Sequence, residues 1–464
     1  MSTINLLKNI HFTTIRPKIF HVKPATAYTY NVTMRTGVAL SNIKRVVSVF
    51  ILRQRSKSDE TQVALFRRCS SMPSFPNHWA AISGSIEKYD ASPFAAAVRE
   101  IGEETNLGEL LGDYSHLLTR GLHVDVPKDE TKGVFGGRVI RVYPFALRLP
   151  DDDEALWSKI EMRGTEHDQM KFQTISDLLD MKEPCVPSLV RAFHHATYGN
   201  YLNLPLDIKE WEKDRINGAA YLARQAVELA SAHSQNKVQQ LDGDLIIPQQ
   251  IAMLRPSMIA IVNAMNEFYR QTTLLSKDVE HIKKELLYSL TYEGDRCIEL
   301  GCEMLMNMMH ERNSTFVVGT FSRSSTLKII LQRIIEKTSS KLSVICSEST
   351  PGDEGRLMAT DIPGACCLPD EEFKQQIIEG KLDMVIVGAD CILLEGNGVV
   401  NKVGTAELAA VCKQANVPIV SFADRWKVWE DCYCPPLEDI FELIPSESFS
   451  HVVVPGGAHE DNVE

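Results

Sequence analysis

The sequence predicts a multidomain α/β protein with an α+β domain first, then a helical subdomain, then a doubly wound parallel sheet. Three observations support this prediction. The chain has 464 residues, too many for a single hydrophobic core. Apolar residues recur at helical spacing over residues 205–312. Beyond residue 313, short continuous apolar runs alternate with helical stretches, which is typical of a buried parallel sheet.

These patterns divide the chain into an extension over residues 1–43, an α+β domain over 44–200, a helical subdomain over 205–312 and a parallel-sheet domain over 313–464. The extension is basic, because no Asp or Glu precedes Asp59. That composition fits a mitochondrial transit peptide. Pro17 and Pro24 interrupt any amphipathic helix and favour the alternative, a basic lead-in that packs on the first domain of a cytoplasmic protein.

Composition and charge narrow the function. The net charge of -12 at pH 7 should repel nucleic acid and acidic membranes, so we expect neither as a partner. No apolar run approaches the roughly 20 residues needed to span a bilayer. The 11 cysteines follow no metal-finger spacing and predict reduced thiols in an intracellular compartment. Local basic pockets can still bind small phosphorylated substrates, which we expect as the partners.

In the first domain, β-branched and aromatic runs predict strands over residues 45–52, 62–66 and 138–147. Another strand over 79–82 precedes a turn at Gly84 and then a helix. That helix carries three carboxylates at i, i+3 and i+4, and therefore on one face: Glu100, Glu103 and Glu104.

Carboxylates packed this closely repel one another, and a hard cation such as Mg²⁺ (or Mn²⁺) among them would make the cluster favourable. A metal held there can polarise a phosphoryl oxygen and activate a water. A solvated acidic helix face is the alternative. The strand and the Gly84 turn ahead of the helix favour the metal site.

Residues 84–107 resemble the Nudix box at Gly84, at the run 99–101 and at the pair Glu103 and Glu104. Residues 171–179 look like the segment that closes Nudix domains. The resemblance implies an α+β Nudix fold and a diphosphate hydrolase, with Glu100, Glu103 and Glu104 as catalytic residues and metal ligands. The departures from the box are Asp90 in place of Glu, one extra residue between Asp90 and Arg99, and Asn106 in place of the last glycine.

In the last domain, three apolar runs end in polar segments, and a fourth polar segment follows shortly after one of them. Ligands bind open parallel sheets at the carboxyl ends of the strands. The segments are residues 319–325, 388–390, 396–405 and 422–427. We expect 396–405 to open a helix, where free N–H groups beside Lys402 would make an anion site. Any one segment could be capping chemistry. Four at one sheet edge favour a binding site.

These segments resemble the family that unites ribose-1,5-bisphosphate isomerase, methylthioribose-1-phosphate isomerase and the regulatory subunits of translation initiation factor 2B. Its most specific signature is residues 388–390 followed by 401–405. The other matching segments are 215–219, 255–257, 348–351 and 355–356. The resemblance covers residues 205–455 and implies a Rossmann-like domain that binds a sugar phosphate and forms homo-oligomers. The implied phosphate or sugar contacts are Gly218, Ala219, Arg255, Ser324, Asn401, Lys402 and Lys427.

Two catalytic candidates follow from the same resemblance, Asp390 and Ser322. Asp390 implies the isomerases, because the initiation-factor subunits generally lack that aspartate. The isomerases have a cysteine where this chain has Ser322 and an arginine where it has Thr350. A thiol with a pKa near 8.5 can exchange a proton at neutral pH, whereas a serine hydroxyl needs an adjacent base.

Two functions from different classes remain open. In the first, the Nudix domain cleaves a nucleotide or phosphoribosyl diphosphate and the second domain binds or isomerises the pentose phosphate. Cleavage of phosphoribosyl diphosphate would yield ribose 1,5-bisphosphate, the substrate of the isomerases. In the second, the C-terminal domain senses a ligand without chemistry, as a regulatory relative of the initiation-factor subunits. Asp390 favours the first function and Ser322 the second.

Overall fold

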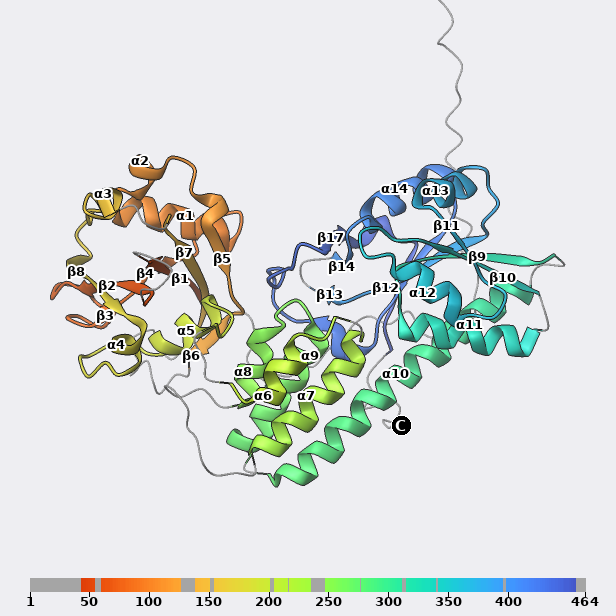
Figure 1. The fold of residues 1–464 in the computed structure, drawn as a ribbon, viewed down its shortest axis with the longest axis horizontal. Coiled ribbons are helices and arrows are strands. Elements are labelled where there is room, and N and C mark those ends of the chain that lie inside the picture. Colours follow the sequence, from red (N-terminus) through yellow and green to blue (C-terminus); the bar gives the residue numbers. More distant parts are fainter. Residues whose placement is uncertain are drawn as a thin grey trace, which may run out of the picture.

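The computed structural model describes residues 43–54, 60–126, 138–150, 154–200, 204–215, 217–234, 247–275, 277–310, 314–338, 341–394 and 398–455. The first 42 residues of the expected extension, Ile216, and Gly396 with Asn397 lie outside these ranges. The first domain forms one lobe, and the helical subdomain and the parallel-sheet domain form the other (Figure 1). In the described part of the chain, no helix combines the length and the apolarity that crossing a bilayer requires.

The first domain is built on an eight-stranded mixed sheet with the central order β3-β2-β1-β7-β5. Its long strands β1 (Ile43–Arg53) and β7 (Val139–Arg148) pair in parallel, and the other pairings are antiparallel. The remaining strands are β2 (Gln62–Arg68), β3 (Trp79–Ala80), β4 (Ile82–Ser85), β5 (Leu118–Arg120), β6 (Val124–Val126) and β8 (His167–Thr174). The strand expected over 79–82 is thus two short strands.

Both faces of this sheet are buried, because alternate residues of β1 enter different cores. Val47 and Val49 pack with helix α1 (Pro93–Glu104), whereas Phe50 and Leu52 pack on the side of α5 (Leu189–Ala196). Helix α1 begins after Ser92, whose side chain accepts a hydrogen bond from the backbone N–H of Ala95 at 3.2 Å. The other helices are α2 (Leu107–Leu111), η2 (Ser115–Leu117), α3 (Glu154–Trp157) and α4 (Ile175–Leu179).

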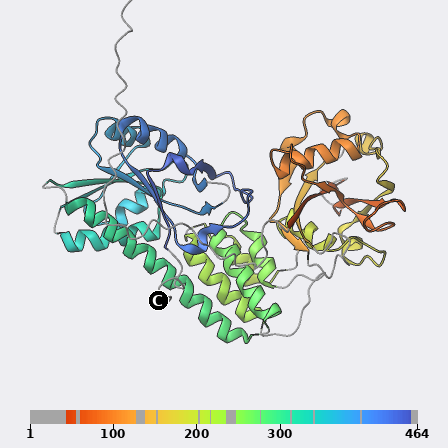
Figure 2. The ribbon, with the colours of Figure 1, turned by 180° about the vertical axis from the view of Figure 1, so that it is seen from behind.

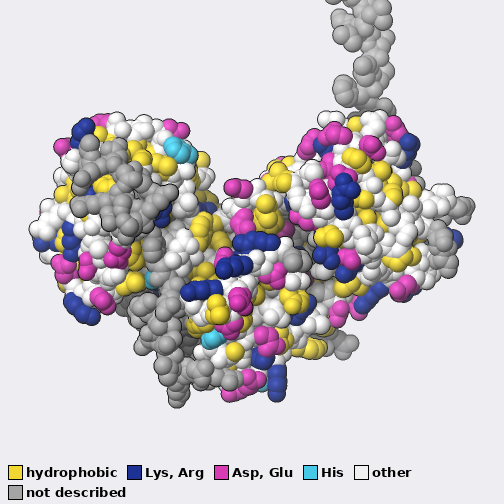
Figure 3. All heavy atoms as spheres, viewed as in Figure 1, with side chains coloured by type: hydrophobic (Ala, Val, Ile, Leu, Met, Phe, Trp, Pro, Cys, Tyr) yellow, Lys and Arg dark blue, Asp and Glu magenta, His cyan; other side chains and the backbone are white. Residues whose placement is uncertain are grey.

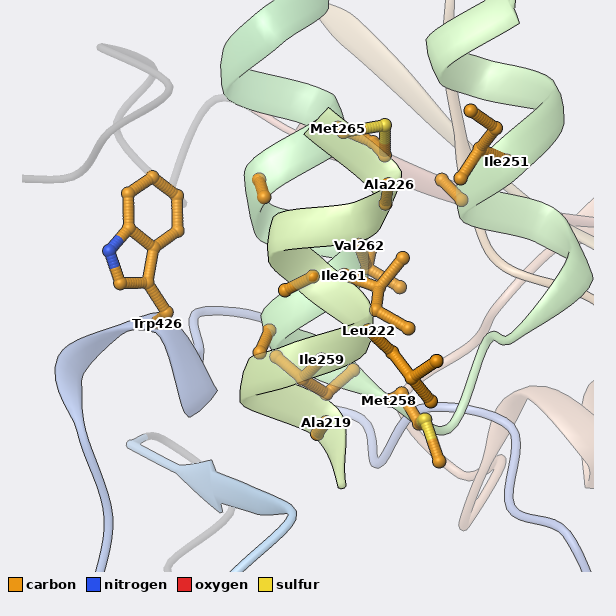
Figure 4. Close-up of a cluster of buried hydrophobic side chains, with 14 of the residues drawn as sticks. Ala219, Leu222, Ala226, Ile251, Met258, Ile259, Ile261, Val262, Met265 and Trp426 are labelled. Atoms are coloured by element: carbon orange, nitrogen blue, oxygen red, sulfur yellow. The ribbon is translucent and has the colours of Figure 1, made fainter. Parts of the chain in front are cut away.

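The described part of residues 206–310 is mostly helical, and most of these helices pack around one apolar core. The elements are α6 (Leu206–Glu212), α7 (Ala219–Ser234), α8 (Ile247–Leu254), α9 (Ile259–Tyr269), the π-helical turn η3 (Arg270–Leu274) and α10 (Val279–His310). Side chains such as Leu222, Ile251 and Val262 meet between these helices (Figure 4). Trp426 and Trp429 of the C-terminal domain belong to the same cluster, so the subdomain and that domain share a core.

The C-terminal domain contains a six-stranded sheet in which every pairing is parallel, as the apolar runs predicted. Its order is β11-β10-β9-β12-β15-β18, so the direction of winding reverses between β9 and β12. Ligands of doubly wound sheets bind at that reversal. The strands are β9 (Phe316–Phe321), β10 (Leu342–Ser347), β11 (Cys366–Leu368), β12 (Met384–Gly388), β15 (Ile419–Phe422) and β18 (His451–Val453). The helices around them are α11 (Ser325–Thr338), α12 (Glu354–Asp361), α13 (Asp370–Ile378) and α14 (Thr405–Ala415).

A second sheet of four strands corrects one expectation. Residues 398–402 do not open a helix but form strand β14 (Gly398–Lys402), and α14 begins only at Thr405. The sheet has the order β16-β13-β14-β17, with β13 (Cys391–Leu393), β16 (Val428–Trp429) and β17 (Phe441–Pro445). The run of Gly398, Val399 and Val400 is fully buried, which a strand between two partners explains better than a helix start.

The two lobes leave an open notch on one side and meet beside the helical subdomain (Figure 3). The opposite view shows the same separation, with the helices α6 to α9 beneath the parallel sheet on the side of the first domain (Figure 2). The contact between the lobes includes residues that follow β16, and also Leu122 of the first domain, which packs into the core of the helical subdomain.

Candidate functional site

The first domain holds a cavity of about 510 Å³ beside the N-terminal part of β1 and the turn after β4. Glu100 and Glu103 of α1 line it, and Glu166 reaches it from the segment before β8. The other wall is aliphatic and includes Val126, Ile140, Val142 and Leu189. A cavity with carboxylates at one end and an apolar wall at the other can hold an extended ligand.

Gly84 is required by the position of the Glu100 carboxylate. A Cβ at residue 84 would lie 1.8 Å from Oε1 of Glu100, far inside van der Waals contact. The carboxylate therefore lies directly over the backbone of β4. The glycine of the predicted motif allows the helix and the strand to approach this closely.

An arginine holds the turn and the helix together. Arg99 donates hydrogen bonds to both oxygens of Asp90, at 3.2 and 3.0 Å, and to the backbone carbonyl of Ser85 at 2.9 Å. It also donates to Glu100 at 2.7 Å and to Glu103 at 3.0 Å. Asp90, which departs from the Nudix box, thus serves as the partner of Arg99.

The third carboxylate points into the protein. Glu104 is 5% exposed, and its Oε2 lies 3.1 Å from Nδ1 of the buried His167. Burial raises the pKa of Glu104, the His167 contact opposes this, and the charge of Glu166 adds to it. Sequence reasoning did not find Glu166 or His167, because the pairing of β8 with β2 brings them to α1.

Like charges crowd this end of the cavity. Burial raises the pKa of Glu100 to about 7, Arg99 opposes the rise, and Glu104 and Glu103 add to it. Such a donor set of hard oxygen ligands fits a divalent cation. Among the described residues, however, no three His, Cys, Asp or Glu side chains lie in the arrangement that holds a metal ion. Glu100 and Glu103 instead accept hydrogen bonds from Arg99, and Glu104 lies beside His167.

In the C-terminal domain, Ser322, Ser324 and Asp390 meet at the reversal of the sheet. Ser322 follows β9 in a left-handed conformation with φ of 64°, and its N–H donates to the hydroxyl of Ser349 at 2.6 Å. Ser324 lies against Gly388, where a Cβ would be 3.2 Å from its hydroxyl. Asp390 follows β12 by two residues, and its N–H donates to the carbonyl of Val400 at 2.9 Å. All three residues therefore lie beyond the carboxyl ends of the neighbouring strands β9 and β12.

Asn401 and Lys402 reach the same region from β14. The Asn401 amide donates to the hydroxyl of Thr405 at 3.2 Å. Lys402 is buried, and its ammonium donates to the carbonyl oxygens of Ser349 and Pro351 and to the carboxylate of Glu354. Lys402 therefore lies at the end of a strand, and its ammonium is bound by the loop of Ser349 and Pro351 and by Glu354, the first residue of α12.

A second cluster surrounds Arg255. Its guanidinium donates to the carbonyl oxygens of Glu212 and Asp214, at 3.3 and 2.9 Å, in the loop that precedes Gly218 and Ala219 at the start of α7. Its Nε lies 3.9 Å from a carboxylate oxygen of Glu438. The expected basic residue and the expected glycine loop therefore share one location.

Lys427 connects this cluster with Asp390. It ends the short helix η4 (Arg425–Lys427), and its ammonium donates to the carbonyl of Ala389 at 2.6 Å. Burial raises the pKa of Asp390, the charge of Lys427 opposes this, and the charge of Glu438 adds to it. Sequence reasoning missed Glu438, which has no motif around it.

Comparisons with known proteins agree with this two-part arrangement. Residues 43–193 match the NUDIX domain, and residues 215–452 match the Initiation factor 2 subunit family. A translation initiation factor eIF-2B subunit 2-like protein of Pyrococcus horikoshii is 26% identical over 229 residues, which are 47% of this chain and 77% of that protein. A ribose 1,5-bisphosphate isomerase of Archaeoglobus fulgidus is 25% identical over 219 residues, 46% of this chain and 67% of that enzyme.

Among solved structures, the translation initiation factor eIF-2B of Pyrococcus horikoshii OT3 aligns with a TM-score of 0.42 and 21% identity, over 54% of this chain and 95% of that chain. The family match over residues 215–452 spans half of the sequence. The chain belongs to the Initiation factor 2 subunit family, and it carries a NUDIX domain ahead of the matching region.

Proposed function

We propose that the NUDIX domain hydrolyses a diphosphate in a nucleotide or phosphoribosyl compound and depends on Mg²⁺ or Mn²⁺. The observation that carries this proposal is the group of carboxylates at one end of the 510 Å³ cavity. Glu100, Glu103 and Glu166 line the same space and would have to draw together around the cation. Glu166 would take the place of the sequence-predicted Glu104, whose carboxylate is buried beside His167. When bound, the cation polarises a phosphoryl oxygen and lowers the pKa of a water.

Side chains of the NUDIX domain hold these carboxylates in position. Arg99 anchors the Asp90 turn to α1 and so fixes where Glu100 and Glu103 lie. The buried contact with His167 holds Glu104 at the base of the cluster. The aliphatic wall of the cavity excludes water from one side of the ligand. Precise placement of this kind is where much of an enzyme's rate advantage originates.

We further propose that the C-terminal domain binds a pentose phosphate at the reversal of its parallel sheet. Arg255, Lys402 and Lys427 supply positive charge there, and Ser324 and Asn401 supply neutral donors. Several convergent donors are what phosphate binding needs. The resemblance to ribose-1,5-bisphosphate isomerases supports an aldose–ketose isomerisation, with Asp390 and Ser322 at the reacting end.

One compound would connect the two proposed activities, as the product of the first and the ligand of the second. Hydrolysis of phosphoribosyl diphosphate breaks one P–O bond of the diphosphate with one water, and yields ribose 1,5-bisphosphate and orthophosphate. The second domain would receive that bisphosphate. This is the simplest reason for the two domains to share a chain.

A regulatory function is the second candidate. Ser322 stands where the isomerases have cysteine, and the Thr350 hydroxyl is bound to the carboxylate of Asp370. Ser322 is held in a left-handed turn, and its hydroxyl has no hydrogen-bonded base among the described residues, which supports ligand binding without turnover. In that case the C-terminal domain reports on a sugar phosphate, as a relative of the initiation-factor subunits.

The test is a screen of the purified full chain with Mg²⁺ against a panel of nucleotide and phosphoribosyl diphosphates. Glu103→Gln removes a cavity carboxylate at nearly constant shape and should abolish hydrolysis. Glu109→Gln is the matched control, because Glu109 lies on the surface in an ion pair with Arg163. Wild-type rates in Glu103→Gln would show that the cation site is wrongly placed.

A further inference from the structure

A carboxylate of the protein itself lies at the Arg255 site. The Glu438 side chain accepts a hydrogen bond from the hydroxyl of Ser257 at 2.8 Å, and the same oxygen lies 3.9 Å from Nε of Arg255. Glu438 is only partly buried, with 34% of its side chain exposed. It therefore sits at the solvent side of a basic residue that is itself enclosed.

Arg255 is built to bind an anion at this point. It is 2% exposed, and its Nε has no hydrogen-bond partner among the described residues. Burial lowers the pKa of Arg255, the charge of Arg215 lowers it further, and Glu438 opposes this only in part. A buried cation with an open N–H donor and a second cation nearby favours an anionic ligand of higher charge than one carboxylate.

Glu438 ends a segment that also binds the other domain. We call residues 430–438, which follow β16, the interdomain loop. At its beginning Asp431 is 1% exposed, and the hydroxyl of Tyr143 in β7 donates a hydrogen bond that its two carboxylate oxygens share, at 3.0 and 2.9 Å. His123 and Arg141 of the NUDIX domain lie 3.3 and 3.6 Å from the same carboxylate.

The contact continues through the next residues of the loop. Arg120 donates to the carbonyl of Cys434 at 2.8 Å, and the rings of Tyr433 and Tyr143 meet edge to face at 5.4 Å. Tyr433 also packs against the hydrophobic core that contains Ala96 and Ile101 of α1. The loop therefore reaches the core beneath the helix that carries the NUDIX carboxylates.

We propose that the interdomain loop is a phosphate-operated connection between the two sites: Glu438 is an internal competitor for the anion site at Arg255, and its displacement by a phosphate alters how Asp431, Tyr433 and Cys434 sit on the NUDIX domain. This inference rests on the proposed sugar-phosphate site. Six residues separate Asp431 from Glu438, and the backbone between them includes Pro435 and Pro436, which limit its freedom. A movement at one end is therefore transmitted rather than absorbed.

Competition between Glu438 and a bound phosphate should have a measurable effect on phosphate affinity. If the carboxylate occupies the anion site for all but about a tenth to a hundredth of the time, the apparent affinity for phosphate falls by roughly 10- to 100-fold. Glu438→Gln keeps the shape and the contact with Ser257 but removes the charge. It should tighten binding by about that factor.

The test uses calorimetry on the full chain with ribose 1,5-bisphosphate and, separately, with inorganic phosphate. Glu438→Gln is compared with wild type and with Glu447→Gln, an equal change of charge at an exposed position in η5 (Ser446–Ser448). In parallel, amide hydrogen exchange is followed with and without ligand in residues 118–126 of the NUDIX domain. Residues 370–378 of α13 are the internal reference.

We expect Glu438→Gln to bind ribose 1,5-bisphosphate about tenfold more tightly or better, with Glu447→Gln like wild type. We also expect ligand to change exchange in residues 118–126 of the wild type. Equal binding by wild type and Glu438→Gln, or binding without a change at 118–126, overturns this inference and leaves the sugar-phosphate site standing. If only inorganic phosphate binds, and more tightly to Glu438→Gln, the competitor stands and the sugar ligand is wrong. If neither anion binds either protein, both proposals fail.

Discussion

Replacing Asp431 by Asn tests whether the lobes are held together by a buried charge. The change removes the carboxylate that Tyr143, His123 and Arg141 approach within 3.6 Å. Breaking a buried ion pair from one side costs about 3–5 kcal/mol. Arg141 keeps a second partner here, because it also makes two hydrogen bonds of 2.8 Å with Asp125. The expected loss in the free energy of unfolding is therefore smaller, about 2–4 kcal/mol, most of it from the Tyr143 hydroxyl and the unneutralised charge.

The difference in stability between wild type and Asp431→Asn should disappear at low pH. Burial acts to raise the pKa of Asp431, but the hydrogen bond and charge of His123, then Arg141 and Tyr143, outweigh it and hold the pKa well below its ordinary value of 3.8. A carboxyl with a lowered pKa in the folded state contributes stability above its unfolded pKa, and that stability is lost as the pH falls. The gap between wild type and Asp431→Asn should therefore narrow below about pH 4.

The assay is urea denaturation, with the two lobes monitored separately because a chain of two domains need not unfold in one step. Asp439→Asn is the control, since Asp439 is exposed eight residues further on. Tyr143→Phe completes a double-mutant cycle with Asp431→Asn, and the two changes should be strongly non-additive. A loss below about 0.5 kcal/mol, the range of ordinary surface substitutions, would refute the reasoning.

Three further outcomes are expected. Gly84→Ala puts a Cβ 1.8 Å from the Glu100 carboxylate and should lower the rate of hydrolysis about 100-fold by displacing that carboxylate. Gly102→Ala, in the helix α1 that carries Glu100, meets nothing within 4 Å and should leave the rate unchanged. Equal rates in the two variants would contradict the close packing of Gly84 against Glu100. Without divalent cations, the melting temperature of wild type relative to Glu100→Gln should fall as the pH rises from about 4.5 to about 7, because the pKa of Glu100 is raised to about 7 in the folded state. A constant difference in melting temperature across that pH range would contradict the raised pKa of Glu100. Ser322→Cys should raise ribose-1,5-bisphosphate isomerase activity and Asp390→Asn should abolish the gain, and ligand binding without any gain in Ser322→Cys would favour the regulatory function.

Much of the fold could be predicted from local sequence patterns. Ser92 and Pro93 mark the start of α1, and the spacing of Glu100, Glu103 and Glu104 follows from helical geometry. The parallel sheet could be predicted because strands buried on both faces must be continuously apolar. The polar residues after β9 and β12 could be placed together because parallel strands end at one edge.

Other features depend on contacts between distant residues. The valines before Asn401 fit a strand and a helix start equally well, and only the pairing of β14 with β13 and β17 decides between them. His167 meets Glu104 because β8 pairs with β2. Asp431 is 288 residues away from Tyr143, and no local pattern marks either residue as a partner of the other. The first two contacts form when distant strands of one domain pair, and the third forms only when the two domains dock.

The central claim is that one chain joins the hydrolysis of a diphosphate to the handling of the phosphorylated sugar that it releases. The most direct measurement is a ³¹P NMR time course of the full chain with Mg²⁺ and phosphoribosyl diphosphate. We predict that the diphosphate signals disappear and that orthophosphate and pentose bisphosphate, as ribose 1,5-bisphosphate or its isomer, appear in equal amounts, in wild type but not in Glu103→Gln. Intact phosphoribosyl diphosphate after prolonged incubation with folded wild-type protein, together with failure to cleave any nucleotide diphosphate in the panel, would contradict the claim.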